Sequence, residues 1–324
     1  MSAIVRLAIA VALAMTGAAH AQTGQAPAAK YPSKQVRVIV PYPAGGPTDV
    51  IGRMVAQHLS ESLGQQFYVD NVAGGGGIIG FTAAARAPAD GYTILITTND
   101  VAVAPATTRN LQYSVSSFAP ISIVAVTPQV VVVHPSIPAK DMKELVALIK
   151  SDPTKYNYAS MSVGFGQLSS IRLFQLGLGL NIPRVPFSGA APMMTSILGN
   201  QTPIAVIGLP PAAPHIKEGK MRALGLSRRS AAFPDVPSFA EQGYPNQDAD
   251  LVIGSVAPAG TPKEIIDLLQ REIAKAVVKP EVKLRLDALG FTGVGSSPEE
   301  FAALMKKDAE TWPQVIKDAD VKLN

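Results

Sequence analysis

The stretch PYPAGGPTDV, residues 41–50, links a run of β-forming residues to an amphipathic segment. It contains prolines, two adjacent glycines and a Thr-Asp pair, but no obvious nucleophile, general base or metal ligand. A Gly-Gly pair is entropically costly in a folded chain, so we expect the backbone itself to serve a purpose at this turn.

The residues after this turn have the period of an amphipathic helix. Residues 49–63 place six apolar side chains on one face: Val50, Ile51, Met54, Val55, Leu59 and Leu63. Strand-like and helical patterns then alternate along the chain. This alternation predicts an α/β fold with two mostly parallel sheets.

The same patterns predict the individual elements. We expect strands at residues 36–40, 67–71, 93–98, 121–126, 130–134, 156–160, 184–187, 203–208, 222–227 and 252–257. We expect helices at residues 49–63, 78–86, 142–150, 167–178, 191–198, 263–278, 280–288 and 298–317. Asp141 is predicted to cap the helix at Met142, and Thr261-Pro262 is typical of an N-cap followed by a first-turn proline.

Two extended segments, residues 122–135 and 250–260, are expected to cross between lobes. They predict two lobes joined by a hinge, with a cleft between them. Residues 31–125 together with 255–324 would form the first lobe, and residues 126–254 the second. The alternative is one large doubly wound sheet.

The N-terminus has the pattern of a secretory signal peptide. Arg6 precedes an apolar run, and Ala19-His20-Ala21 follows as a cleavage site, so residues 1–21 are the predicted signal and residues 22–30 a disordered leader. The alternative, an N-terminal membrane anchor, would need about 20 apolar residues. The chain has no cysteine, which excludes disulfides and lipid attachment through cysteine. We therefore expect a soluble, unlipidated periplasmic protein.

Composition excludes several functions. The net charge is only +4 and no basic patch interleaved with aromatic residues occurs, so we expect no nucleic-acid partner. Gly75, Gly77 and Gly80 match GxGxxG with Asp100 downstream, but an exported protein argues against a dinucleotide cofactor. The chain lacks GxSxG and HExxH, and its histidines have no partners at ligand spacing. We expect no catalytic residue, metal or cofactor.

Strand-to-helix turns are the strongest candidates for binding. The first N–H groups of a helix lack an internal acceptor and carry positive dipole charge, so a glycine turn there favours an anion. Asp49 would repel an anion if it pointed inward, so we expect it to accept N–H groups of its own loop. Residues 96–103, 158–170 and 185–194 repeat this arrangement. Several such turns could converge on one carboxylate, although each could also be a simple capped turn.

Ordered stretches along the mature chain resemble one family. They include YPSKQVRVIVPYPAGGPTDV, GGGGIIG, APADGYTIL, FAPISIVA, PHIKEGKMRALGLS, FPDVPSFAEQGYP, APAGTP and VIKDADVKLN. The chain resembles the Bordetella uptake gene (Bug) family, the extracytoplasmic receptors of tripartite tricarboxylate transporters. The resemblance implies a two-lobed, type II-like periplasmic binding protein that closes over a small organic acid.

The resemblance also implies a site, a partner and a ligand class. Transporter subunits would be the partners of a monomeric receptor; a signalling partner and an exported hydrolase using the same cleft are the alternatives. Where the family usually has polar residues, this chain has Phe165 and Ile207, which favours an aromatic or aliphatic carboxylate, although packing could explain both. The implied ligand-binding residues are Tyr42, Ala44, Gly45, Gly46, Thr98, Asn99, Ser160, Ser162, Gly164, Phe165, Gly166, Ser188, Gly189 and Ile207.

Overall fold

The computed structural model describes residues 31–162, 164–247 and 249–321. The predicted signal peptide and leader, residues 1–30, lie outside the described residues. Contacts within the chain divide it into two units, with the boundary between Ser33 and Lys34. Every described helix and strand belongs to the unit that begins at Lys34. Within the described residues, no helix has the length and apolar character needed to cross a membrane.

One sheet has six strands in the order β11-β4-β10-β3-β1-β2. β1 lies between β2 and β3 and pairs in parallel with both, and β2 is the edge strand. β10 runs antiparallel to β3 and β4, and β11 runs antiparallel to β4. The strands are β1 (Val36–Val40), β2 (Phe67–Asn71), β3 (Thr93–Thr98), β4 (Phe118–Thr127), β10 (Leu251–Pro258) and β11 (Thr292–Gly293).

The other sheet has five strands in the order β7-β6-β8-β5-β9. β6 pairs in parallel with β7 and β8, whereas β5 runs antiparallel to β8 and β9. The strands are β5 (Gln129–Val133), β6 (Tyr158–Met161), β7 (Arg184–Phe187), β8 (Ile204–Gly208) and β9 (Arg222–Leu226).

Both sheets are therefore mixed, and the expectation of mostly parallel sheets needs correction. β4 ends at Thr127 and β5 begins at Gln129, so the chain passes directly from one sheet into the other. β5 starts where β8 ends, because Gln129 pairs with Gly208, and this order forces an antiparallel pairing. β10 likewise starts opposite the end of β3, since Ile253 pairs with Thr98. Every antiparallel pairing involves β4, β5 or β10, the strands at the two crossings between sheets.

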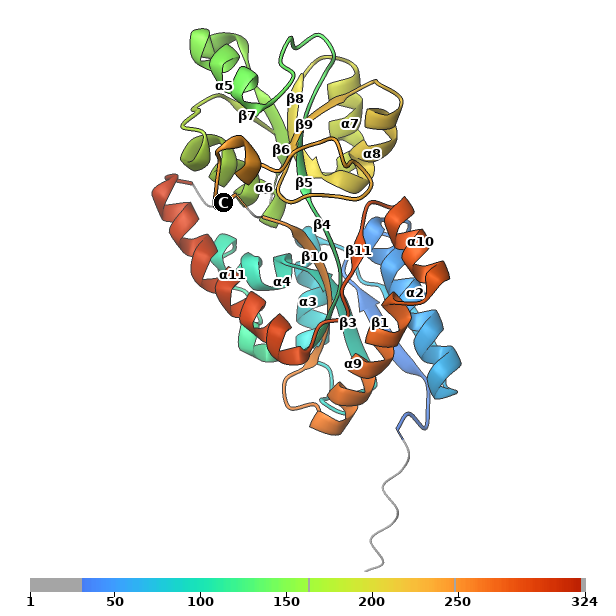
Figure 1. The fold of residues 1–324 in the computed structure, drawn as a ribbon. Helices are drawn as coiled ribbons and strands as arrows, with labels where there is room; N and C mark the ends of the chain where they lie inside the picture. Colours follow the sequence, from blue (N-terminus) through green and yellow to red (C-terminus); the bar gives the residue numbers. More distant parts are fainter. Residues whose placement is uncertain (1–30, 163, 248, 322–324) are drawn as a thin grey trace, which may run out of the picture. The chain divides into compact units, whose positions relative to one another are not determined.

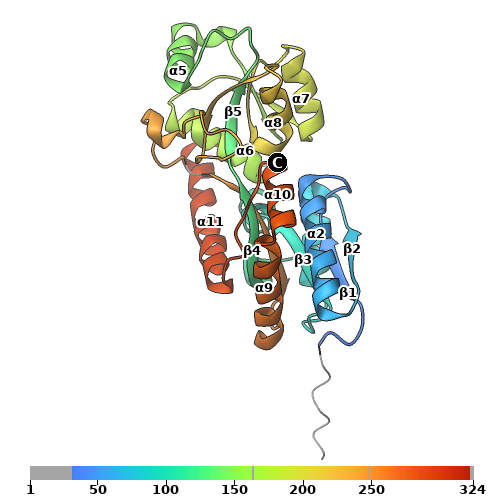
Figure 2. The ribbon, with the colours of Figure 1, turned by 45° about the vertical axis from the view of Figure 1, so that its right-hand side comes forward.

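Helices flank both sheets. In Figure 1, α5, α7 and α8 surround the five-stranded sheet, and Figure 2 shows α9 and α11 beside β4, which both helices contact. The helices are α2 (Pro47–Leu63), α3 (Ile78–Ala85), α4 (Asp100–Thr107), α5 (Met142–Ser151), α6 (Gly164–Ile171), α7 (Ala190–Leu198), α8 (Leu209–Lys217), α9 (Lys263–Val277), α10 (Pro280–Ala288) and α11 (Pro298–Asp318). Short helical segments are η1 (Gly75–Gly77), η2 (Val115–Ser117), η3 (Pro153–Lys155), η4 (Arg172–Gly177) and η5 (Ala240–Gln242).

The helix ends test the capping predictions. Asp141 accepts a 2.8 Å hydrogen bond from the backbone N–H of Glu144, which confirms it as the N-cap of α5. The prediction for Thr261 was wrong. Pro262 occupies the N-cap position of α9, and the Thr261 hydroxyl donates instead to the carbonyl of Pro258 at 2.8 Å. A hydroxyl that is satisfied within its own turn has no need of the helix N–H groups.

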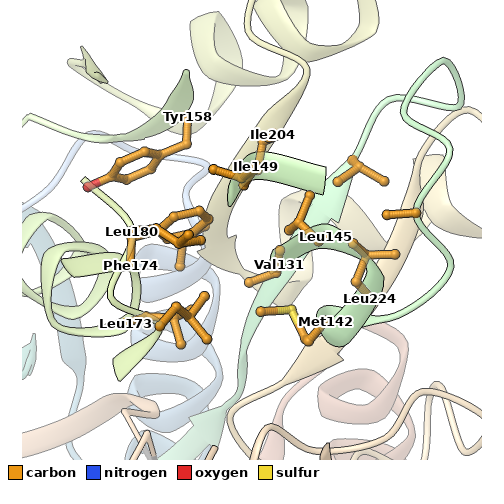
Figure 3. Packing of buried hydrophobic residues seen from close by; sticks show 14 of the residues in the cluster. Val131, Met142, Leu145, Ile149, Tyr158, Leu173, Phe174, Leu180, Ile204 and Leu224 are labelled. Atoms are coloured by element: carbon orange, nitrogen blue, oxygen red, sulfur yellow. The ribbon is translucent and has the colours of Figure 1, made fainter. Parts of the chain in front are cut away.

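A hydrophobic cluster fixes the five-stranded sheet against α5. Met142, Leu145 and Ile149 of α5 are fully buried against strand residues such as Val131 (Figure 3). Beside them the rings of Tyr158 and Phe174 stack, with centroids 4.3 Å apart and planes only 4° from parallel. Interior packing of this kind resists displacement, so it holds the ends of β6 and β8 in fixed positions.

Candidate functional site

A cavity of about 280 Å³ lies where the two sheets exchange strands. Its wall includes the ends of β3, β6 and β8 and the starts of β5 and β10. Ligands of open α/β sheets bind beyond the carboxyl ends of the strands, and this cavity lies at that position in both sheets. The turn after β1 and the first turns of α2, α6, α7 and α8 complete the wall.

Six of the fourteen predicted ligand-binding residues line this cavity: Tyr42, Gly46, Thr98, Phe165, Gly166 and Ile207. Phe165 and Ile207 are also packing residues, only 2% and 5% exposed respectively. The ring of Phe165 meets Trp312 of α11 edge to face, with centroids 5.3 Å apart. The two side chains therefore combine core packing with an apolar surface on the cavity.

The other eight predicted residues are not among those that line the cavity: Ala44, Gly45, Asn99, Ser160, Ser162, Gly164, Ser188 and Gly189. Several of these have interactions within the protein. The Ser160 hydroxyl is buried, accepts a 3.2 Å bond from Arg184 and donates to the carbonyl of Met161. The N–H of Ser162 donates to the carbonyl of Phe187 at 2.8 Å. A direct contact between these eight residues and a ligand stays a prediction.

Asp49 holds the PAGG turn, as expected from the sequence. Its Oδ2 accepts hydrogen bonds from the backbone N–H of Gly45 at 2.8 Å and from Nε of Arg53 at 3.0 Å, while Oδ1 accepts from Asn71 at 2.9 Å. Gly45 has a φ of 85°, a conformation that glycine adopts readily. Burial alone would raise the pKa of Asp49, but these three donors outweigh it and lower that pKa.

A second aspartate, Asp100, lies in the cavity wall at the start of α4. Its Oδ2 accepts from the hydroxyls of Tyr42 and Thr98, each at 3.0 Å, and its Oδ1 accepts from the N–H of Phe165 at 2.7 Å. Burial raises the pKa of Asp100, although all three hydrogen bonds oppose that rise. Burial and the neighbouring Asp100 charge raise the pKa of Tyr42 well above its ordinary value, so Tyr42 stays a hydroxyl donor.

Gln129 places its side-chain amide in the same wall. Its backbone is held by Ser227, because the Gln129 N–H donates to the Ser227 hydroxyl at 2.9 Å and the Ser227 N–H donates to the Gln129 carbonyl. The side chain is only 4% exposed, and its Oε1 has no hydrogen-bond partner among the described residues. A buried amide oxygen without a partner costs free energy, so it is suited to a ligand that brings a donor.

The cavity provides neutral hydrogen-bonding groups but no positively charged side chain. Among the described residues that form its wall there is no Lys, Arg or His. The described part of the chain also contains no group of three or more His, Asp or Glu residues that could hold a metal ion. The first turn of α8 supplies few donors, since Pro210 and Pro211 have no N–H and Leu209 donates to Pro128. The first turns of α2 and α7 remain as sources of free N–H groups.

Sequence reasoning missed Asp100 and Gln129 as residues of the site. Asp100 directly follows Thr98 and Asn99 at the end of a predicted strand, and that position was a usable signal. Gln129 is the polar residue that begins the second half of the predicted crossover. Its place in the cavity depends on a pairing between distant strands, which sequence periodicity does not specify.

Residues 51–321 match the family described as tripartite tricarboxylate transporter family receptor. The chain belongs to this family. Protein BugT of Bordetella pertussis is 35% identical over 90% of this chain and 91% of that protein. The periplasmic binding protein BugD is 31% identical, with a TM-score of 0.77 over 90% of this chain and 99% of that one. Rpa4515 of R. palustris, solved with adipate, is 29% identical, with a TM-score of 0.79 over 90% of this chain and 98% of that one.

These likenesses establish the two-lobed periplasmic binding protein fold and a family of solute-binding receptors. The division of the chain into lobes at residues 126 and 254 stays a prediction. β4 ends at Thr127 and β10 begins at Leu251, so the strands change sheets close to both predicted boundaries.

Proposed function

We propose that this protein is a periplasmic receptor that captures a small organic carboxylate for a tripartite tricarboxylate-type transporter. The cavity shared by the two sheets is the observation that carries this proposal. It lies at the carboxyl ends of strands from both sheets, has a volume of about 280 Å³, and is close to the free N–H groups of helix first turns. The relative solved with adipate adds support, because adipate is a small organic carboxylate.

The ligand's carboxylate would be held by peptide N–H groups and by neutral side chains. Charge-assisted hydrogen bonds to backbone N–H groups are strong enough to neutralise an anion without a cation. Thr48, in the first turn of α2, and Ala190, in the first turn of α7, both line the cavity. The Gln129 amide would supply a further donor, because rotation about its last torsion presents either its NH₂ or its oxygen to the cavity.

The body of the ligand would be apolar. Met161, Phe165, Ile207, Pro211 and Leu251 form most of the remaining wall. An aliphatic or aromatic carboxylate buries its hydrocarbon against these residues and gains hydrophobic free energy, whereas an additional ionic group would be left without a partner.

The cellular setting follows from the same proposal. Residues 1–21 would direct export and be removed, and the absence of cysteine excludes attachment through an N-terminal lipidated cysteine. The mature receptor would act as a soluble monomer that hands its ligand to membrane subunits.

Native mass spectrometry tests the proposal directly. Residues 22–324 would be expressed, and co-purified small molecules would be identified and then returned to the stripped protein. We expect a carboxylic acid that raises the melting temperature in a concentration-dependent way, because it binds only the folded state. The acid should be recovered chemically unchanged after prolonged incubation. Conversion into a product would instead favour the exported hydrolase.

Two variants on β8 test the preference for an apolar ligand body. Ile207→Thr keeps a β-branched side chain but places a hydroxyl on the cavity wall, so the affinity for an aliphatic acid should fall several-fold. Ile204→Thr is the matched control, because Ile204 is on the same strand but packs in the core cluster behind α5. Calorimetric titration should show weakened binding for Ile207→Thr only. Equal affinities for the two variants would contradict an apolar contact at Ile207.

A further inference from the structure

The N-terminus of α6 already holds a carboxylate, and it belongs to the protein itself. Asp100 begins α4, and α4 is in contact with α6 (Figure 1). Its Oδ1 accepts the 2.7 Å hydrogen bond from the N–H of Phe165, in the first turn of α6. That N–H has no acceptor within its own helix and lies at the positive end of the helix dipole. The place where residues 158–170 were expected to bind a ligand carboxylate is therefore filled.

The hydrogen-bond partners of Asp100 match an ionised carboxylate. Its Oδ2 lies 3.0 Å from each of the Tyr42 and Thr98 hydroxyls, which also lie 2.7 Å from each other, and its Oδ1 faces a backbone N–H donor. An ionised carboxylate only accepts hydrogen bonds, so the Phe165 N–H and the hydroxyl pair can satisfy it without a proton. When it is ionised, Asp100 gives the cavity wall one negative charge before any ligand enters.

Gly164 provides the space that this carboxylate needs. A Cβ atom at this position would collide with Oδ1 of Asp100, and the residue has a φ of 71°. The close approach between α4 and the start of α6 therefore depends on both the glycine and the aspartate.

Elsewhere in the cavity one polar group is buried and unused. The Gln129 side chain is 4% exposed, and its Oε1 has no partner among the described residues. This amide can pair with one polar group of a ligand. A second carboxylate on the same ligand would find no Lys, Arg or His in the described wall, and it would meet the charge of Asp100.

We propose that Asp100 is a specificity-determining residue, which restricts the cavity to acids with a single carboxylate and an apolar body and rejects dicarboxylates. The inference rests on the proposed function, since it assumes that the cavity binds a carboxylate. The chain's own carboxylate takes the helix terminus that a second ligand carboxylate would need. Rejection then comes from like-charge repulsion within a largely apolar cavity, and a repulsive element of this kind sets specificity.

The test compares matched pairs of acids by isothermal titration calorimetry at neutral pH. The probes are butanoate with succinate, hexanoate with adipate, octanoate with suberate, and benzoate with terephthalate. Within each aliphatic pair the two acids have the same number of carbon atoms and differ by one carboxylate. Terephthalate has the ring of benzoate with one added carboxylate. For the wild-type protein we expect at least one monocarboxylate to bind, and to bind about tenfold or more tightly than its matched dicarboxylate.

The Asp100→Asn variant then removes the charge while keeping an oxygen that accepts from Phe165. We expect the preference for the monocarboxylate to shrink about tenfold or more, mainly because the dicarboxylate gains affinity. Asp308→Asn is the matched control. Asp308 is a buried aspartate, 8% exposed, but it lies on α11 and does not line this cavity, so the preference should not change.

The outcomes separate the inference from the proposed function. If the wild-type protein binds any dicarboxylate as tightly as its matched monocarboxylate, the role of Asp100 is refuted while carboxylate capture stands. An unchanged preference in a folded Asp100→Asn variant refutes it equally. If Asp100→Asn does not fold, the wild-type comparison decides alone. If no probe binds the wild-type protein, the carboxylate proposal and the inference fail together.

Discussion

Asp49 and Asp100 each lie beyond the end of a strand in the six-stranded sheet, yet their pKa values shift in opposite directions. Burial favours the neutral form of both. Asp49 has the guanidinium of Arg53 among its donors, and its pKa is lowered. Asp100 has only neutral donors, and its pKa is raised. Hydrogen bonds from Arg53, Gly45 and Asn71 therefore outweigh burial at Asp49, whereas burial prevails at Asp100.

These opposite shifts predict opposite pH dependences of stability. A raised pKa in the folded state means that Asp100 costs stability as the pH rises from the ordinary value of 3.8 through its raised pKa. The free energy of unfolding of the wild type relative to that of Asp100→Asn should therefore decrease as the pH rises over that window. Asp49 has a lowered pKa, so its stabilisation is complete above 3.8 and is lost as the pH falls through the lowered value.

Urea unfolding of the wild type, Asp100→Asn and Asp49→Asn at a series of acidic pH values measures both effects. The advantage of the wild type over Asp49→Asn should grow as the pH rises, in contrast to that over Asp100→Asn. Curves that change in the same direction for both variants would contradict the assigned environments.

The close approach at Gly164 gives a second prediction at this scale. Gly164→Ala combines a left-handed backbone conformation with the collision against Asp100. Gly179→Ala is the control, because Gly179 has a φ of 63° and its Cβ would have open space. The control should lose about 1–2 kcal/mol of unfolding free energy from backbone strain alone. We expect a clearly larger loss for Gly164→Ala in denaturant unfolding, and equal losses would argue against the contact.

Among the elements, those with clear periodicity were predicted well. β1, β2, β3 and β7 have the predicted bounds, and the helix after the PAGG turn starts two residues before the predicted Asp49 and ends at Leu63 as expected. These segments combine a repeating apolar pattern with recognisable turns, so local sequence is sufficient to define them.

Sequence reasoning missed α4 and α8, and both helices contribute to the site. Pro105 lies inside α4, while Pro210, Pro211 and Pro214 lie in α8. Pro210 and Pro211 occupy the first turn of α8, where proline is tolerated, but Pro105 and Pro214 lie inside their helices, where proline normally ends the helix. Packing overrides that signal: α8 contacts β5 and β8, and α4 contacts β3, α3, α6 and α11. Burial of small apolar residues against these neighbours offsets the lost hydrogen bonds.

A prediction at the scale of elements concerns the cap of α5. Asp141→Ala removes the acceptor for the Glu144 N–H and should lower the free energy of unfolding by about 1 kcal/mol. Asp141→Asn keeps an oxygen that can cap the helix, so it should stay within a few tenths of a kcal/mol of the wild type. Chemical denaturation of the three proteins makes the comparison. Similar losses for both variants would show that charge, rather than capping, is what Asp141 supplies.

At the scale of the whole molecule, one asparagine ties together three distant segments. Asn99 follows β3, its Oδ1 accepts from the N–H of Val252 in β10 at 2.7 Å, and its Nδ2 donates to Asp308 of α11 at 3.0 Å. Asp308 also accepts from Trp312 at 3.2 Å, and the Trp312 ring packs against Phe165 in the cavity wall. These contacts link the end of β3 to the crossover strand β10 and to the C-terminal helix.

Asn99→Ala should therefore destabilise the molecule strongly. The substitution leaves the N–H of Val252 and the carboxylate of Asp308 each short of a partner, and unsatisfied buried groups cost about 1–3 kcal/mol apiece. We expect a total loss of about 3 kcal/mol in urea unfolding. The control Asn181→Ala, at an exposed residue, should be nearly neutral. A loss below about 1 kcal/mol for Asn99→Ala would contradict a linking role.

The sequence by itself determined the α/β class, most of the strands, the first βα turn held by Asp49, and the family. All of these depend on local periodicity, turn chemistry or ordered motifs. The tertiary structure alone decided which turns meet in the cavity. It placed Asp100 at the N-terminus of α6 and Gln129 in the wall of the same cavity. Those positions depend on how strands far apart in the chain pair. Long-range pairing is set by the burial of the whole core, and no short stretch of sequence contains that information.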